Sequence, residues 1–349
     1  MNGRGLPAAL GRAILGACGI CGLAYVAWVD LWPPGDGDRM RSDALAEKPT
    51  DEASAPRRAG HPSPCGHLRI GWTAWADAEF VTQLTARLLR TELGCDVELM
   101  MTDIGVQYRG LAGSQLDLML MAWLPNTHGP YFDEVAESVV DLGPLYTGAR
   151  LGWAVPTYVP ERALGAIEDL HKEEVRKRLA GAIQGIDPGS GLMQASERAL
   201  VDYGLGDYDL LSGSGAAMAA AVERAIRLRQ WIVVTVWSPH WMFARWNLRY
   251  LADSKRSLSQ SEQVHALARK GFGRDFPAAV DVITRMYFPL EELERAMLDA
   301  VERSTEAAVE HYLRRHPARV SYWLTGELPP DGEGSGSGAR PGWTSGPAE

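Results

Sequence analysis

Three tryptophans stand where apolar, strand-like segments of this sequence end, and aromatic rings at such positions can form a ligand site. The three are Trp75, Trp123 and Trp237, which follow the segments 68–72, 116–121 and 231–236. In an open α/β sheet, the carboxyl ends of parallel strands meet at the edge that binds ligands. We therefore expect these rings to face one cleft. The alternative is that Trp123 belongs to the core and that the nearby His128 is an ordinary loop residue.

A glycine-rich turn supplies a second kind of chemistry. Residues 185–191 (GIDPGSG) precede a helix that we expect to begin near Leu192. Such a turn offers free backbone N–H groups to an anion. Aromatic rings attract a quaternary ammonium group by cation–π interaction, on the order of 0.5–2 kcal/mol per ring. The rings and the turn together predict a site for a zwitterion whose cation cannot donate hydrogen bonds.

Four motifs connect the sequence to a known family. They are residues 122–128 (AWLPNTH), 185–191 (GIDPGSG), 237–243 (WSPHWMF) and 268–272 (ARKGF). Over about residues 67–325 the sequence resembles the substrate-binding proteins of ABC transporters for glycine betaine and related compatible solutes. The resemblance implies an α/β fold of the two-lobed periplasmic-binding-protein class, type II, with the ligand in the cleft between the lobes.

The resemblance also implies roles for individual residues. In the family, three tryptophans surround the trimethylammonium group, and by position these are Trp75, Trp123 and Trp237. The ligand carboxylate is held by two backbone amides and a histidine, which correspond to Gly185, Ile186 and His128. We expect no catalytic residue, no metal and no cofactor.

Length and composition fit this expectation. A chain of 349 residues with 46% hydrophobic content can form a sizeable core in two lobes. We expect lobe one to comprise residues 67–156 plus about 262–325, and lobe two residues 157–261. The net charge of −9, without a cluster of Lys and Arg, argues against a nucleic-acid partner.

The two ends of the chain differ from the middle. Residues 13–29 are apolar and uncharged, and Arg4 and Arg12 precede them. This pattern predicts a membrane anchor within residues 1–32, although a lipoprotein signal cleaved before Cys18 is an alternative. Residues 33–66 and 326–349 contain few large apolar side chains, so we expect a disordered tether and a disordered tail. The folded part would then lie outside the cytoplasmic membrane.

Two of the four cysteines, Cys65 and Cys95, fall at the start of the folded part. They form a disulfide if this region is extracytoplasmic, and two unpaired structural thiols are the other possibility. None of the cysteines has metal-ligand partners at the usual spacing.

The expected function is that of an extracytoplasmic solute-binding protein of an ABC importer. Its ligand would be glycine betaine or a related quaternary ammonium compound such as proline betaine, carnitine or choline, and its partner a membrane permease. We expect a monomer. A membrane-tethered sensor of the same solutes is the alternative. A secreted hydrolase, with His128 or His240 as base and Ser190 or Ser238 as nucleophile, is a weaker hypothesis because no nucleophile motif is present.

Overall fold

The computed structural model describes residues 65–258 and 261–327, all within one compact unit of the chain, residues 59–349. The expected anchor (1–32), nearly all of the expected tether (33–66) and most of the expected tail (326–349) lie outside the described residues. In the two described ranges, no helix is long and apolar enough to span a bilayer.

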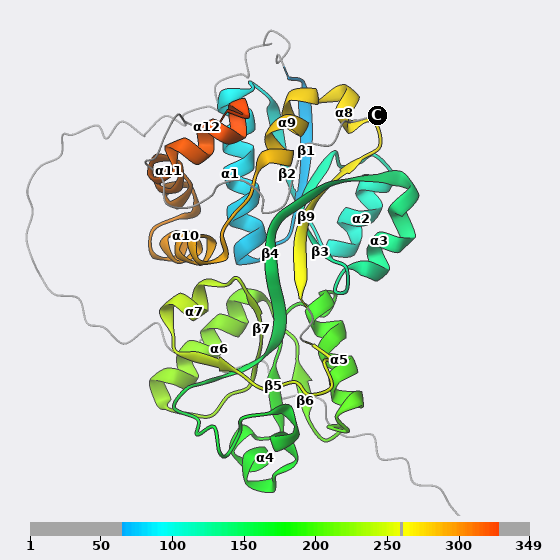
Figure 1. Ribbon diagram of the computed structural model, residues 1–349. Helices are drawn as coiled ribbons and strands as arrows, with labels where there is room; N and C mark the ends of the chain where they lie inside the picture. Colours follow the sequence, from blue (N-terminus) through cyan, green and yellow to red (C-terminus); the bar gives the residue numbers. More distant parts are fainter. Residues whose placement is uncertain (1–64, 259–260, 328–349) are drawn as a thin grey trace, which may run out of the picture. The chain divides into compact units, whose positions relative to one another are not determined.

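The strands form one hydrogen-bonded series in the order β2-β1-β3-β9-β4-β7-β5-β6, with β8 paired to β4 (Figure 1). Their bounds are β1 (His67–Trp72), β2 (Asp96–Met101), β3 (Leu118–Leu124), β4 (Val139–Pro156), β5 (Ala182–Gln184), β6 (Asp209–Leu211), β7 (Val234–Ser238), β8 (Leu248–Tyr250) and β9 (Glu262–Arg269). Strand β4 pairs with β9 up to Ala149 and with β7 from Arg150 onward. Because one strand serves both halves of the series, the chain forms the two lobes that the sequence predicts.

Lobe one contains β1, β2, β3, β9 and the first part of β4. Its α-helices are α1 (Ala76–Glu92), α2 (Ile104–Ala112), α3 (Gly129–Val135), α8 (Phe272–Asp275), α9 (Pro277–Arg285), α10 (Leu290–Glu302), α11 (Thr305–Arg315) and α12 (Pro317–Thr325). In α1, Phe80, Leu84 and Leu88 recur every four residues and are all buried, as the spacing predicts. Every residue of β3 is buried, which fits a central strand covered on both faces.

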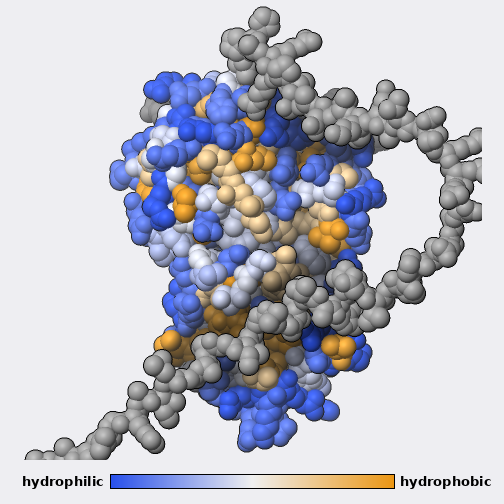
Figure 2. All heavy atoms as spheres, turned by 180° about the vertical axis from the view of Figure 1, so that it is seen from behind, coloured by the Kyte–Doolittle hydropathy of each residue, from blue (hydrophilic) through white to orange (hydrophobic). Residues whose placement is uncertain are grey.

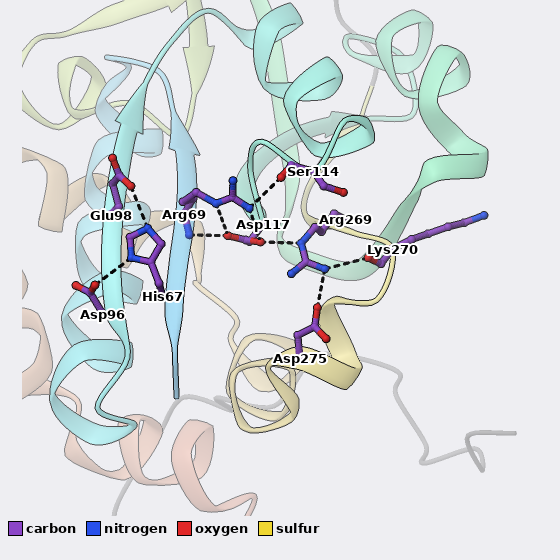
Figure 3. Close-up of polar contacts among 9 residues, drawn as sticks. All are labelled: His67, Arg69, Asp96, Glu98, Ser114, Asp117, Arg269, Lys270 and Asp275. Atoms are coloured by element: carbon purple, nitrogen blue, oxygen red, sulfur yellow. Dashed lines mark hydrogen bonds and ion pairs between the residues drawn. The ribbon is translucent and has the colours of Figure 1, made fainter. Parts of the chain in front are cut away.

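A buried carboxylate ties three segments of lobe one together (Figure 3). Asp117 accepts hydrogen bonds from the backbone N–H and the guanidinium of Arg69 and from Nε of Arg269. Arg269 also pairs with Asp275 at 2.9 Å. Burial acts to raise the pKa of Asp117, but the hydrogen bonds from Arg69 and Arg269 hold that pKa below its usual value. The ARKGF motif thus fixes the end of β9 against β1 and β3.

A disulfide joins Cys65 to Cys95, the residues just ahead of β1 and β2. The sequence left this pairing open. The bond holds together the starts of two strands that are parallel neighbours in the sheet.

Lobe two contains the rest of β4 with β5 to β8. Its helices are the 3-10 helix η2 (Ile167–His171), α4 (Glu173–Leu179), α5 (Gly191–Asp202), α6 (Gly215–Leu228) and α7 (Trp241–Arg245). Trp153 of β4 is fully buried and donates its indole N–H to Ser196 Oγ of α5 at 2.9 Å. On the face seen in Figure 2, hydrophobic residues are interspersed among hydrophilic ones, as on most globular proteins.

Two element predictions were wrong in detail. The strand expected at 116–121 is β3, so Trp123 lies inside the strand and not after it. The strand expected at 231–236 is β7, which likewise contains Trp237.

The candidate ligand site

A small cavity lies between the lobes and is lined by residues of both. The three predicted tryptophans line it together, each less than 8% exposed. The complete lining is Trp75, Trp123, Thr127, His128, Leu151, Ile186, Ser190, Gly191, Leu192 and Trp237. None of these side chains carries a charge at neutral pH, because the only titratable one is His128, whose pKa burial lowers to about 3.

Two of the rings are held by carboxylates of the opposite lobe. Trp75, the N-cap residue of α1 in lobe one, donates its indole N–H to Asp187 Oδ2 of lobe two at 3.1 Å. Trp237 of lobe two donates its indole N–H to Asp77 Oδ1 of lobe one, also at 3.1 Å. The third ring differs, since Trp123 directs its indole N–H at the sulfur of Met121 within its own strand.

Asp77 is fully buried and also accepts a hydrogen bond from the Tyr146 hydroxyl at 2.8 Å. Burial raises the pKa of Asp77 to about 6, against the effect of the hydrogen bonds from Tyr146 and Trp237. The carboxylate is not among the residues that line the cavity. It therefore acts on the cavity through the Trp237 ring.

The loop after Trp123 places a neutral histidine at the cavity wall. The Trp123 N–H donates to His128 Nδ1 at 3.1 Å, and the His128 N–H donates to the Trp123 carbonyl at 2.8 Å. The buried carboxylate of Glu262 accepts hydrogen bonds from the N–H groups of Asn126 and Thr127, which fixes the loop between Trp123 and His128. Because Nδ1 accepts a hydrogen bond and the ring is uncharged, the proton resides on Nε2. His128 can thus donate one hydrogen bond to an anion.

The glycine-rich turn presents a helix N-terminus to the same cavity. Ser190 is the N-cap residue of α5, and its Oγ accepts the Met193 N–H at 3.2 Å. Gly191 and Leu192 are the first two residues of this 12-residue helix, so their N–H groups have no acceptor within it. A Cβ on Gly191 would lie 2.5 Å from Cγ2 of Thr127, so only glycine allows this close approach to lobe one.

The structure places Gly185 away from the cavity wall. Its N–H donates to the Leu211 carbonyl of β6 at 2.7 Å, and Gly185 is not among the lining residues. Ile186 does line the cavity, and its N–H meets the sulfur of Met193, a weak acceptor, at 3.4 Å. Of the turn and the helix after it, Ile186 and the first residues of α5 are the ones that line the cavity.

The residues named for a hydrolase have other roles. Ser190 caps α5, and the Ser238 hydroxyl donates to Glu294 at 3.1 Å, so among the described contacts neither serine is hydrogen-bonded to a histidine. His240 caps α7 through Nδ1 and lies edge-on against Trp237, with ring centroids 4.4 Å apart. Within the described ranges, no group of three or more His, Cys, Asp or Glu side chains could hold a metal ion.

Several site residues were not predicted. Leu151 lies opposite Trp237 in the pairing of β4 with β7, and Thr127 lies in the His128 loop. Tyr131 of α3 spans the cleft, because its hydroxyl donates to the Gly189 carbonyl at 3.2 Å and accepts from Gln194 at 2.7 Å. Of Leu151, Thr127 and Tyr131, only Thr127 lies in a motif that the sequence analysis singled out, residues 122–128.

The family model described as the substrate-binding domain of an ABC-type glycine betaine transport system matches residues 66–315. The chain belongs to this family. The glycine betaine/carnitine transport binding protein GbuC of Listeria monocytogenes is 33% identical over 165 residues, which cover 46% of this chain. The match spans 55% of that relative's length.

Solved structures of the family share the fold. Lactococcal OpuAC, in its closed-liganded conformation with glycine betaine, is 33% identical. It matches with a TM-score of 0.68 over 74% of this chain and 99% of that chain. The glycine/betaine/L-proline-binding protein ProX of Borrelia burgdorferi is 26% identical, with a TM-score of 0.69 over 74% and 96% of the two chains. These matches confirm the predicted type II fold of two lobes around a cleft.

Proposed function

We propose that the chain captures glycine betaine, or a closely related betaine, for import by an ABC transporter. The observation that carries this proposal is the convergence of three indole rings and an uncharged helix N-terminus on one cavity between two lobes. The names of the relatives, which refer to glycine betaine, support the same ligand class.

Each end of a betaine has a counterpart in the cavity. Trp75, Trp123 and Trp237 offer π faces to the trimethylammonium group, at about 0.5–2 kcal/mol per ring, and more where water is excluded. The carboxylate is received by the α5 N-terminus, by the Ile186 amide and by the Nε2–H of His128. The site thus has rings for the cation and N–H donors for the anion.

The described lining residues carry no charge, and this allows the expected affinities of different ligands to be ranked. A betaine is zwitterionic, so its burial introduces no net charge into the cavity. Choline would bring an unpaired positive charge and leave the N–H donors of α5 and His128 without an acceptor, and an unsatisfied buried donor costs about 1–3 kcal/mol. We expect carboxylated quaternary amines to bind more tightly than choline.

The physiological setting is part of the same proposal, and family membership supports it. As a monomer held outside the cytoplasmic membrane by residues 1–32, the binding domain would deliver its ligand to a permease in that membrane. Residues 33–66 would serve as the tether between anchor and domain.

Titration of the purified protein with glycine betaine, carnitine, choline and glycine, followed by tryptophan fluorescence, tests the ligand class. Saturable binding of glycine betaine, weaker binding of choline and none of glycine is the expected result. Binding of glycine as tight as that of glycine betaine would show that the rings do not recognise the methylated head. No response to any quaternary amine would refute the proposal.

A further inference from the structure

Two of the rings in the cavity take their hydrogen-bond acceptors from the opposite lobe, and the exchange is reciprocal. Lobe one supplies the Trp75 N–H to Asp187, and lobe two supplies the Trp237 N–H to Asp77. From this we propose that Asp77 and Asp187 are positioning residues that set these two rings in their ligand-binding orientation only when the lobes are closed. The inference rests on the proposed function, which it deepens by naming residues that couple closure to recognition.

The acceptors are firmly placed in their own lobes. Asp77 lies in the first turn of α1, has no exposed surface, and is held by the Tyr146 hydroxyl of β4 at 2.8 Å. Asp187 lies in the turn before α5, where its carbonyl accepts the Ser190 N–H at 3.0 Å. Separation of the lobes would therefore remove the acceptor from each indole N–H while leaving the carboxylates in place.

Trp123 provides an internal comparison. Its backbone N–H and carbonyl are both bonded to His128, and its indole N–H contacts the sulfur of Met121 in the same strand. All of these partners belong to lobe one. The Trp123 ring thus keeps its orientation when the lobes separate, whereas the Trp75 and Trp237 rings each lose the acceptor of their indole N–H.

The carboxylates also act on the strength of the cation–π contact. An indole whose N–H donates to a carboxylate gains electron density on its ring, and the ring face attracts a cation through that negative charge. Asp77 and Asp187 thereby bring negative charge to the cation through the rings, although neither lines the cavity. Closure, ring orientation and affinity for a quaternary amine are then coupled.

A double-mutant cycle on the full chain tests the coupling at the more exposed of the two pairs. Asp187→Ala removes the acceptor, and Trp75→Phe keeps an aromatic face but removes the N–H. Asp187→Ala is expected to weaken glycine betaine binding about tenfold, the loss typical of a hydrogen bond to a charged group. In the Trp75→Phe background it should weaken binding less than about twofold. Equal losses in the two backgrounds would overturn the proposal.

Tyr131→Phe is the matched control for closure. It removes hydroxyl contacts across the cleft with Gly189 and Gln194 but leaves both indole hydrogen bonds. Its effect on affinity should add to that of Trp75→Phe without coupling. A coupling as large as that of Asp187→Ala would show that any contact across the cleft has the same effect, which also overturns the proposal.

Hydrogen exchange of the indole N–H groups, followed by NMR of protein labelled at tryptophan, gives a readout that a general structural role would not move. In the betaine-bound protein, Asp187→Ala should speed exchange at Trp75 only, and Asp77→Ala at Trp237 only. The indole of Trp153, bonded to Ser196 within lobe two, is the unaffected reference.

The same measurement separates the two proposals. If the wild-type protein binds no betaine, the proposed function fails, and the positioning role is then decided by exchange in protein whose lobes are held closed by a disulfide engineered across the cleft. Unchanged exchange at Trp75 in Asp187→Ala would then refute it. If betaine binds but the indole protons do not respond to these substitutions, the function stands and the positioning role is wrong.

Discussion

Two buried histidines should make this fold sensitive to mild acid, and the size of the effect can be worked from their surroundings. Burial lowers the pKa of His128 and of His240 to about 3, from 6.5 in the unfolded chain. A group that binds its proton more weakly in the folded state stabilises that state above the unfolded pKa. This stability is lost as the pH falls below 6.5. At pH 5, protonation of each histidine in the unfolded chain should have lowered the free energy of unfolding by about 2 kcal/mol.

Asp77 opposes this trend. Burial raises its pKa to about 6, so the unfolded state, with its lower pKa, binds fewer protons at this group between pH 6 and 4. Protonation of Asp77 therefore returns about 1 kcal/mol to the folded state by pH 5. The net expectation for the three groups is a loss of about 2–3 kcal/mol between pH 7 and pH 5. Carboxylates with lowered pKa values, such as Asp117, lose their stabilising effect only at lower pH.

Urea denaturation at pH 7, 6 and 5 measures this loss, and His240→Asn isolates one contribution. Asparagine can still accept the Met242 N–H that His240 Nδ1 accepts at 3.1 Å, but it does not titrate. The variant should lose about 2 kcal/mol less than the wild type over this range. An equal pH dependence in the two proteins would refute the reasoning for His240. A free energy of unfolding that does not fall between pH 7 and pH 5 would refute it for both histidines.

Three further results are expected. Trp123→Ala should raise the Kd for glycine betaine about ten- to a hundredfold, as measured by calorimetry. Trp241→Ala, outside the cavity lining, should change the Kd less than about threefold, and similar effects of the two variants would contradict binding by the three lining tryptophans. The double variant Cys65→Ser/Cys95→Ser opens a cross-link between residues 30 apart and should lower the free energy of unfolding by about 3 kcal/mol, so an unchanged urea midpoint would contradict a stabilising role. Asp117→Ala leaves Arg69 and Arg269 without their shared partner and should lower the free energy of unfolding by about 3–5 kcal/mol in the same assay. The Kd for glycine betaine should stay unchanged because Asp117 does not line the cavity, and a large rise in Kd would contradict this expectation.

The structure brings the three predicted rings together in one cavity, but it does not bring every predicted backbone amide there. Trp75, Trp123 and Trp237 could be recognised because each follows or ends an apolar strand in an open sheet. The N–H of Gly185, by contrast, donates to the carbonyl of Leu211, which lies in the three-residue strand β6. So short a strand leaves no periodic pattern in the sequence.

The sequence could not reveal where a strand begins or which carboxylate of the opposite lobe accepts each indole N–H. Trp231 looks like the start of β7, yet pairing begins at Val234, and Trp231 instead lies under the Arg178 guanidinium at 4.8 Å. Asp187 and Asp77 could be seen as acids near the cage. Which ring each one accepts from depends on how the lobes meet, and no local pattern records that.

The uncharged lining of the cavity has a consequence for the medium in which the protein works. Salt weakens binding by screening charges that attract one another across solvent, and at 1 M the screening length is only about 3 Å. Here a ligand without net charge meets rings and N–H groups in a cavity between the lobes whose lining carries no charge, so mobile ions have little to screen. Affinity for a betaine should therefore persist as the surrounding salt concentration rises, which is when a cell needs a compatible solute.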